Sequence, residues 1–344
     1  MKSLKFLLSA ASIVLGCSYS PENSDLMLSG GTGGTAYDFE TDSESSSGIM
    51  EEDVPSTSLD LGADTGNAIF QCRDLDILFI IDNSGSMSDD QDKLVQEIPL
   101  FIAKLMELGL GDNSLHIGVI STDDYLGNPV ECNNLGALVT KVNTGYYPDS
   151  IPVMCGPYDE GFNFMTNVDD LEESFTCAAR LGSNGSGSEK PIEALIEALK
   201  PGQSETVSPF ESRHDNCNEN FHRRAWTTGD NNYNGAGLAV IIITDEDDTD
   251  SAGNPEEWIE MLKWLRRPLD SQISGTLNNT TFLALLPNNQ CATAGFIPVK
   301  LEEFLMMVPT SYVGSICDKD YTAFFDKAVG VVSKGCGFEY EPEP

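Results

Sequence analysis

The chain carries 55 acidic residues against 19 lysines and arginines over 344 residues, which gives a formal charge of −36. This balance argues against nucleic-acid binding, which needs a basic surface, and favours a cation or a basic partner. The length fits one large domain or two ordinary ones, and a hydrophobic content of 40% suffices for a core.

The first residues have the pattern of an export signal. A lysine-containing start precedes an apolar run over 6–15 that is too short to span a bilayer. The run ends in Val14-Leu15-Gly16-Cys17, which resembles the cleavage box of bacterial lipoproteins. The resemblance implies a lipoprotein signal peptide over 1–16, a lipidated Cys17 as membrane anchor and, with Ser18, sorting to the outer membrane. The alternative is an ordinary secretory signal cleaved nearby.

A polar segment follows, and it is rich in Ser, Gly, Thr, Asp and Glu with few large apolar residues. Such a composition cannot bury enough surface to offset the entropy of ordering. We therefore expect residues 17–67 to be a disordered acidic tether behind the lipidated cysteine. The folded domain is expected over 68–338, with an acidic tail over 339–344.

The folded part alternates apolar runs with segments of helical spacing. Strands are expected at 76–81, 115–122, 238–244, 281–286 and 311–316, and helices at 87–108, 169–181, 189–199, 255–266, 299–308 and 319–333. The segment 122–168 is unusually long for a loop and predicts an insertion with a hairpin around 137–142. Alternating strands and helices predict an α/β fold: a doubly wound, mainly parallel central sheet flanked by helices, with long disulfide-stapled loops.

Eight cysteines remain beside Cys17, an even number that predicts four disulfides in an exported chain. Cys72 and Cys336 are expected to pair because the two ends of a domain often lie close together. Cys132 is expected to pair with Cys155 within the insertion. The remaining expected pairs are Cys177 with Cys217 and Cys291 with Cys317.

Polar residues follow the first strand directly. Asp82, Ser84 and Ser86 alternate at the point where this strand gives way to a helix. Ligands of open α/β sheets bind at this edge, and hard cations prefer oxygen ligands. The three side chains are therefore candidate cation ligands. The alternative is a strand-to-helix turn in which they act only as helix caps.

Asp82-x-Ser84-x-Ser86 after a hydrophobic strand resembles the metal-ion-dependent adhesion site (MIDAS) of von Willebrand factor A (vWA) domains. The resemblance covers about 74–334 and implies a Rossmann-like sheet and a bound Mg²⁺ (or Mn²⁺ or Ca²⁺). It also implies a second acid after the next central strand, which matches Asp245. In the family the hydroxyls bind the metal directly and the acids often act through water.

The family's threonine before a sheet-covering helix is replaced here by Glu189, with Ser186 and Ser188 as nearby substitutes. A third carboxylate would neutralise the ion, tightening metal binding while weakening attraction for an external carboxylate. The alternative is that Glu189 only caps the helix. The acids Asp247, Asp248 and Asp250 either hold a second cation or are simply solvated.

These features predict an exported lipoprotein of the bacterial cell envelope, on its periplasmic or outer face. It would bind a divalent cation and engage a protein ligand in adhesion or assembly. The alternatives are a structural envelope protein with a purely stabilising metal site, or a metal-dependent phosphatase-like enzyme. We expect no enzyme, because no nucleophile elbow is present and Ser84 stands where such phosphatases need an acid.

Overall fold

A computed structural model describes residues 72–108, 114–144, 151–201, 215–222, 236–268, 275–288 and 297–337. The expected signal segment, Cys17, the tether and the tail over 339–344 lie outside these ranges, as does Cys291. No helix within them is both long and apolar enough to cross a bilayer.

A six-stranded sheet forms the centre of the domain, in the order β5-β2-β1-β6-β7-β8. Neighbouring strands run parallel except for the short edge strand β5, which is antiparallel to β2. The strands are β1 (Leu75–Ile81), β2 (Leu115–Ser121), β5 (Met165–Thr166), β6 (Gly237–Ile243), β7 (Thr280–Leu286) and β8 (Ser311–Ser315). The predicted mainly parallel α/β sheet is confirmed.

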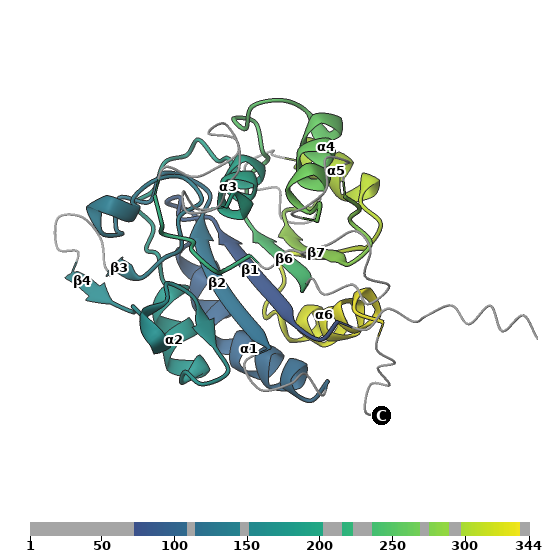
Figure 1. Cartoon of the computed structure of the whole chain (residues 1–344). Coiled ribbons are helices and arrows are strands. Elements are labelled where there is room, and N and C mark those ends of the chain that lie inside the picture. The colour runs from purple at the N-terminus through teal and green to yellow at the C-terminus, as the bar shows by residue number, and fades with distance from the viewer. Residues whose placement is uncertain are drawn as a thin grey trace, which may run out of the picture. The chain divides into compact units, whose positions relative to one another are not determined.

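Helices cover both faces of this sheet (Figure 1). One face carries α1 (Ser88–Met106), α2 (Leu171–Ala178) and α6 (Thr322–Gly335), and the other carries α3 (Pro191–Leu199), α4 (Pro255–Leu265) and α5 (Val299–Met307). Strand β1 is buried along its whole length because successive side chains enter the two opposite cores. Phe79 packs in the first core, for example, and Ile80 in the second.

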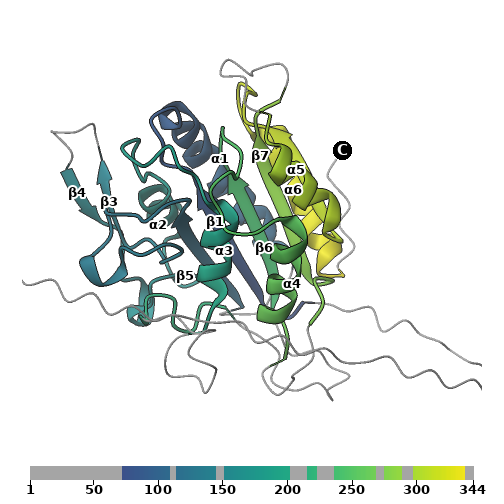
Figure 2. The same ribbon diagram turned by 90° about the horizontal axis from the view of Figure 1, so that it is seen from above.

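The insertion after β2 holds an antiparallel hairpin of β3 (Lys141–Thr144) and β4 (Ile151–Met154), with short 3₁₀ turns at Val130–Cys132 and Asp159–Gly161. Figure 2 shows the hairpin beyond the β2 side of the sheet. It begins later than predicted. The buried Asn128 side chain donates to the carbonyls of Cys132 and Leu138 and accepts from the amide of Thr140, which holds this stretch as a packed loop.

The disulfides confirm one predicted pair and correct two. Cys72 bonds to Cys336 with Cα atoms 4.8 Å apart, joining the two ends of the described domain. Cys132 bonds to Cys217, and Cys155 bonds to Cys177, instead of the expected pairs Cys132–Cys155 and Cys177–Cys217. The reason is that β4 returns Cys155 to the side of α2, where Cys177 lies. Cys317 is disulfide-bonded, and its expected partner Cys291 lies outside the described residues.

Candidate metal centre

Two neighbouring parallel strands bring the acidic motifs together. Ile81 at the end of β1 pairs with Ile243 at the end of β6. The amide of Asp82 continues this register by donating to the carbonyl of Ile243 over 3.0 Å. Asp82 and Asp245 therefore leave the sheet side by side, as the sequence pattern indicated.

Asp82 is fully buried at this edge. Its Oδ1 accepts the Ser84 amide at 2.7 Å, and its Oδ2 accepts the Thr244 hydroxyl at 2.7 Å. Burial raises the pKa of Asp82 to about 6 despite these bonds, and the nearby charge of Asp245 adds to the shift. Thr244 is not among the site residues predicted from sequence, where its signal is a hydroxyl at the end of an all-aliphatic strand.

A chain of hydroxyl contacts joins the first motif to the second. The hydroxyls of Ser84 and Ser86 lie 3.2 Å apart, and Ser86 Oγ donates to Asp245 Oδ1 over 3.1 Å. Ser86 and Asp245 are 159 positions apart in sequence. Burial raises the pKa of Asp245 as well, and the Ser86 hydrogen bond partly opposes that shift. The motif therefore forms one continuous oxygen-lined site.

Gln91 on α1 fixes the loop that closes the site. It is buried, and its Nε2 donates to the carbonyls of Asp82 and Gly182 while its Oε1 accepts the Gly182 amide. Further along the loop, Gly185 packs against the side-chain amide of the buried Asn83, so a Cβ at this position would force that side chain to move. The signal for Gln91 in the sequence is a lone amide on the apolar side of a helix.

Glu189 lies buried behind this loop, with 1% of its surface exposed. Its Oε2 accepts the hydroxyl of Thr122, whereas its Oε1 is buried and accepts no hydrogen bond from the described residues. Burial, followed by the charge of Asp82, raises the pKa of Glu189 to about 8. Thr122, at the end of β2, was another residue missed from sequence. An orphaned carboxylate oxygen at this depth is suited to a cation.

Glu189 does not cap helix α3. The Ile192 amide in the first turn of that helix donates to Asp248 over 2.9 Å, and the Glu193 amide donates to the hydroxyl of Ser251. The nearby substitute Ser186 turns its hydroxyl to its own loop, where it accepts the Ser188 amide. Glu189 is therefore the residue of this segment whose side chain is held at the depth of Asp82.

The acidic run after β6 has a different role from the one expected. Asp247 accepts the amides of Lys300 and Leu301 at the start of α5, while the buried Asp248 accepts from α3 and from Ser251. These two carboxylates cap helices, and Asp250 is bonded locally by Thr249. In the ranges described, no three His, Cys, Asp or Glu side chains form a metal-binding group. A second cation there is not supported.

The donor set of the main site nevertheless fits a hard cation. Asp82, Ser84, Ser86 and Asp245 present only oxygen donors, the ligands that hard cations prefer, although no three acidic side chains of the described residues converge on one point. No described lysine or arginine forms an ion pair with Asp82, Asp245 or Glu189. Within the described part of the chain, these three acids therefore have no positively charged side chain as a partner.

Comparison with known proteins gives only distant structural likenesses. No protein-family model matches the chain, and no curated protein matches it. Proximal thread matrix protein 1 from the mussel byssus is 14% identical with a TM-score of 0.37, covering 78% of this chain and 49% of that one. Its form described as having a zinc-occupied MIDAS motif covers 76% and 49%, at 14% identity and a TM-score of 0.36. The chain thus spans about half the length of the mussel protein.

A second likeness is to a single-residue mutant of the PilB minor pilin from Streptococcus sanguinis. It is 11% identical with a TM-score of 0.38, covering 78% of this chain and 64% of that one.

Proposed function

We propose that the chain is an exported lipoprotein whose vWA-like domain binds a divalent cation and mediates protein–protein interaction or adhesion at the bacterial cell envelope. The observation that carries the proposal is the Ser86–Asp245 hydrogen bond, which joins two distant motifs beside the buried Asp82. The orphaned Oε1 of Glu189 supplies an independent sign that the cluster lacks a positive partner.

The cation would be held by the hydroxyls of Ser84 and Ser86, with Asp82 and Asp245 binding directly or through water. Mg²⁺ suits such a set because it keeps several of its waters, and Mn²⁺ and Ca²⁺ accept the same oxygen donors. When bound, the ion supplies a Lewis-acidic centre for a ligand's oxygen. The hydrogen bonds that Ser84 and Thr244 donate to Asp82 would orient the Asp82 carboxylate for the ion.

Glu189 favours tight cation binding over strong attraction of an external carboxylate. Its charge adds to those of Asp82 and Asp245, so the bound ion would be largely neutralised. A purely stabilising metal site is therefore the second candidate, and the burial of Glu189 is what favours it.

Export and lipidation at Cys17 belong to the same proposal, with the outer membrane as the site of attachment. The described disulfides support an oxidising compartment. We propose no catalytic activity. Both oxygens of Asp82 are engaged by hydrogen bonds, and the position two residues later carries a hydroxyl.

Calorimetry on the full chain tests the cation site. Mg²⁺, Mn²⁺ and Ca²⁺ are titrated into the wild type, into Asp82→Ala, and into the control Glu303→Ala, which removes an exposed carboxylate on α5. We expect saturable binding by the wild type and the control and its loss in Asp82→Ala. Absence of saturable binding to the wild type would overturn both metal proposals.

A crystal structure with Mn²⁺ separates adhesion from pure stabilisation. An ion with a coordination position open to solvent supports adhesion, because a partner's oxygen can reach it. An ion fully enclosed by protein oxygens, with Glu189 among them, supports the stabilising role.

A further inference from the structure

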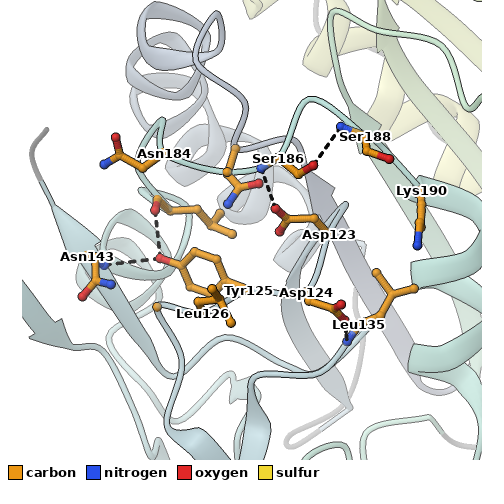
Figure 3. A pocket seen from close by; sticks show the side chains of 14 residues that line it. Asp123, Asp124, Tyr125, Leu126, Leu135, Asn143, Asn184, Ser186, Ser188 and Lys190 are labelled. Atoms are coloured by element: carbon orange, nitrogen blue, oxygen red, sulfur yellow. Dashed lines mark hydrogen bonds between the residues drawn. The ribbon is translucent and has the colours of Figure 1, made fainter. Parts of the chain in front are cut away.

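A cavity shown in Figure 3 has Asn83, the residue after Asp82, in its lining. It has a volume of about 410 Å³ and is formed by the segment after β2, the loop before α3 and the start of the hairpin. Asn83 and Ser186 line it and belong to the loops that surround the cation site. Residues of the loops that carry the candidate cation ligands therefore also form this cavity.

The walls of this side pocket are fixed by hydrogen bonds. The Tyr125 hydroxyl donates to the Leu181 carbonyl over 2.8 Å and accepts the Asn143 amide, as drawn in Figure 3. Asp123 accepts the Ser186 amide, which ties the loop before α3 to the end of β2. The pocket is thus largely preformed, which lowers the ordering cost of binding.

Apolar and acidic groups line the pocket together. Tyr125, Leu126 and Leu135 supply apolar surface, and Leu126 is 77% exposed. Asp124 uses Oδ1 to accept the Leu135 amide, while its Oδ2 accepts no hydrogen bond from a described residue. An aliphatic stem with a cationic head matches this combination, because such side chains pack the stem and keep the charge at a polar rim.

The charge balance favours a positive occupant. Two acids, Asp123 and Asp124, line the pocket, against one basic residue, Lys190. The pocket lining therefore has a formal negative charge, in keeping with the formal charge of −36 of the whole chain.

We propose that this side pocket receives a lysine or arginine side chain of the partner protein, beside the group that contacts the cation. The proposal deepens the function proposed above and rests on it for the identity of the partner as a protein. The pocket itself requires no cation, so it can be tested separately.

The test is an NMR titration of the full chain in EDTA, following the backbone amides of Asp124, Tyr125 and Gly127. The probes are Nα-acetyl-arginine N-methylamide, its neutral norleucine analogue and its acidic glutamate analogue. We expect saturable shifts with arginine and weaker binding of norleucine by about two- to fivefold, the range of an exposed ion pair. The glutamate analogue is expected to bind weakest.

Two variants of opposite sign sharpen the test. Asp124→Asn keeps an oxygen for the Leu135 amide and should weaken arginine binding by about two- to fivefold. Lys190→Met should strengthen it, because a like charge is removed from the lining. Equal binding of arginine and norleucine, or preferential binding of glutamate that depends on Lys190, would overturn the inference. Arginine binding without saturable metal binding would instead overturn the proposed function and leave the pocket assignment standing.

Discussion

The Thr244 hydroxyl at the end of β6 donates to Asp82 Oδ2 at the end of β1, over 2.7 Å. The bond links the second motif to the first beneath the candidate cation site, and both residues are fully buried. It holds Asp82 in place before any ion arrives.

Thr244→Val keeps the shape of the side chain and removes this bond. We expect a loss of about 1–3 kcal/mol in the free energy of unfolding, since a buried carboxylate oxygen loses its donor. Mg²⁺ affinity should fall as well, because Asp82 is no longer oriented. Urea unfolding and calorimetry measure the two effects, with Thr244→Ser as the control that retains a hydroxyl. Unchanged values for both quantities in the valine variant would contradict this role.

The stability of the cation-free protein should decrease with pH. Burial raises the pKa of Asp82 to about 6 and of Glu189 to about 8, whereas both are near 4 in an unfolded chain. The folded state therefore holds these protons more tightly, so stability is highest below about pH 4 for these groups and falls as the pH rises through about 6 and about 8. The charged neighbours that enter these shifts are Asp123, Asp245 and Glu246, all acidic.

Differential scanning calorimetry in EDTA checks this dependence between about pH 5 and about pH 8. We expect the Tm to fall, with each kcal/mol lost corresponding to roughly 2–4 °C for a domain of this size. Saturating Mg²⁺ should reduce the fall by stabilising the ionised carboxylates. A Tm in EDTA that rises steadily over this range would be the opposite result.

Glu189→Gln should separate cation affinity from ligand attraction. Removal of one negative charge is expected to weaken Mg²⁺ binding by about tenfold, corresponding to about 1.4 kcal/mol. The bound ion should then attract acetate more strongly, because fewer carboxylates neutralise it. Calorimetry with Mg²⁺, followed by acetate, measures both. Tighter Mg²⁺ binding in the variant would show that Glu189 opposes the ion.

The acids after β6 should differ in their effects on stability. Asp248→Ala removes a buried acceptor for the Ile192 amide and for Ser251, and we expect a loss of about 2 kcal/mol. Asp250→Ala, at an exposed position, should change the free energy of unfolding by less than about 0.5 kcal/mol. Equal effects in urea unfolding would contradict the capping role of Asp248.

The corrected disulfides can be checked by mapping the unreduced protein with mass spectrometry. We expect peptides linking Cys132 to Cys217 and Cys155 to Cys177. Replacing the Cys155–Cys177 pair by serines should cost about 3 kcal/mol, because its loop of 22 residues is short. Replacing Cys132 and Cys217, 85 residues apart, should cost more, about 4–5 kcal/mol.

Sequence patterns predicted the sheet well because its strands are buried on both faces. The apolar runs ending at Ile81 and Ile243 can only be central strands, and their parallel pairing brings Asp82 and Asp245 together. This part of the candidate site follows from periodicity, the family resemblance and topology.

The rest depends on side-chain placement that periodicity does not determine. Thr122, Thr244 and Gln91 enter the site through hydrogen bonds to residues far away in sequence. The hairpin begins later than the sequence predicts because the buried Asn128 side chain hydrogen-bonds backbone groups of the preceding loop. Without these bonds, the same backbone groups would need a partner strand. Two disulfides were mispaired because proximity in sequence is a poor guide within a folded insertion.

The Cys72–Cys336 bond sets how the domain would carry mechanical load. Cys72 precedes β1 at one end of the strand, while the candidate site begins at Asp82, beyond its other end. A pull between the proposed tether and a partner held at the site would run along β1. The covalent backbone of β1 would carry this load, and the hydrogen-bonded ladders to β2 and β6 would hold the strand within the sheet. The covalent bond between Cys72 and Cys336 would keep the two ends of the described domain together under such a load.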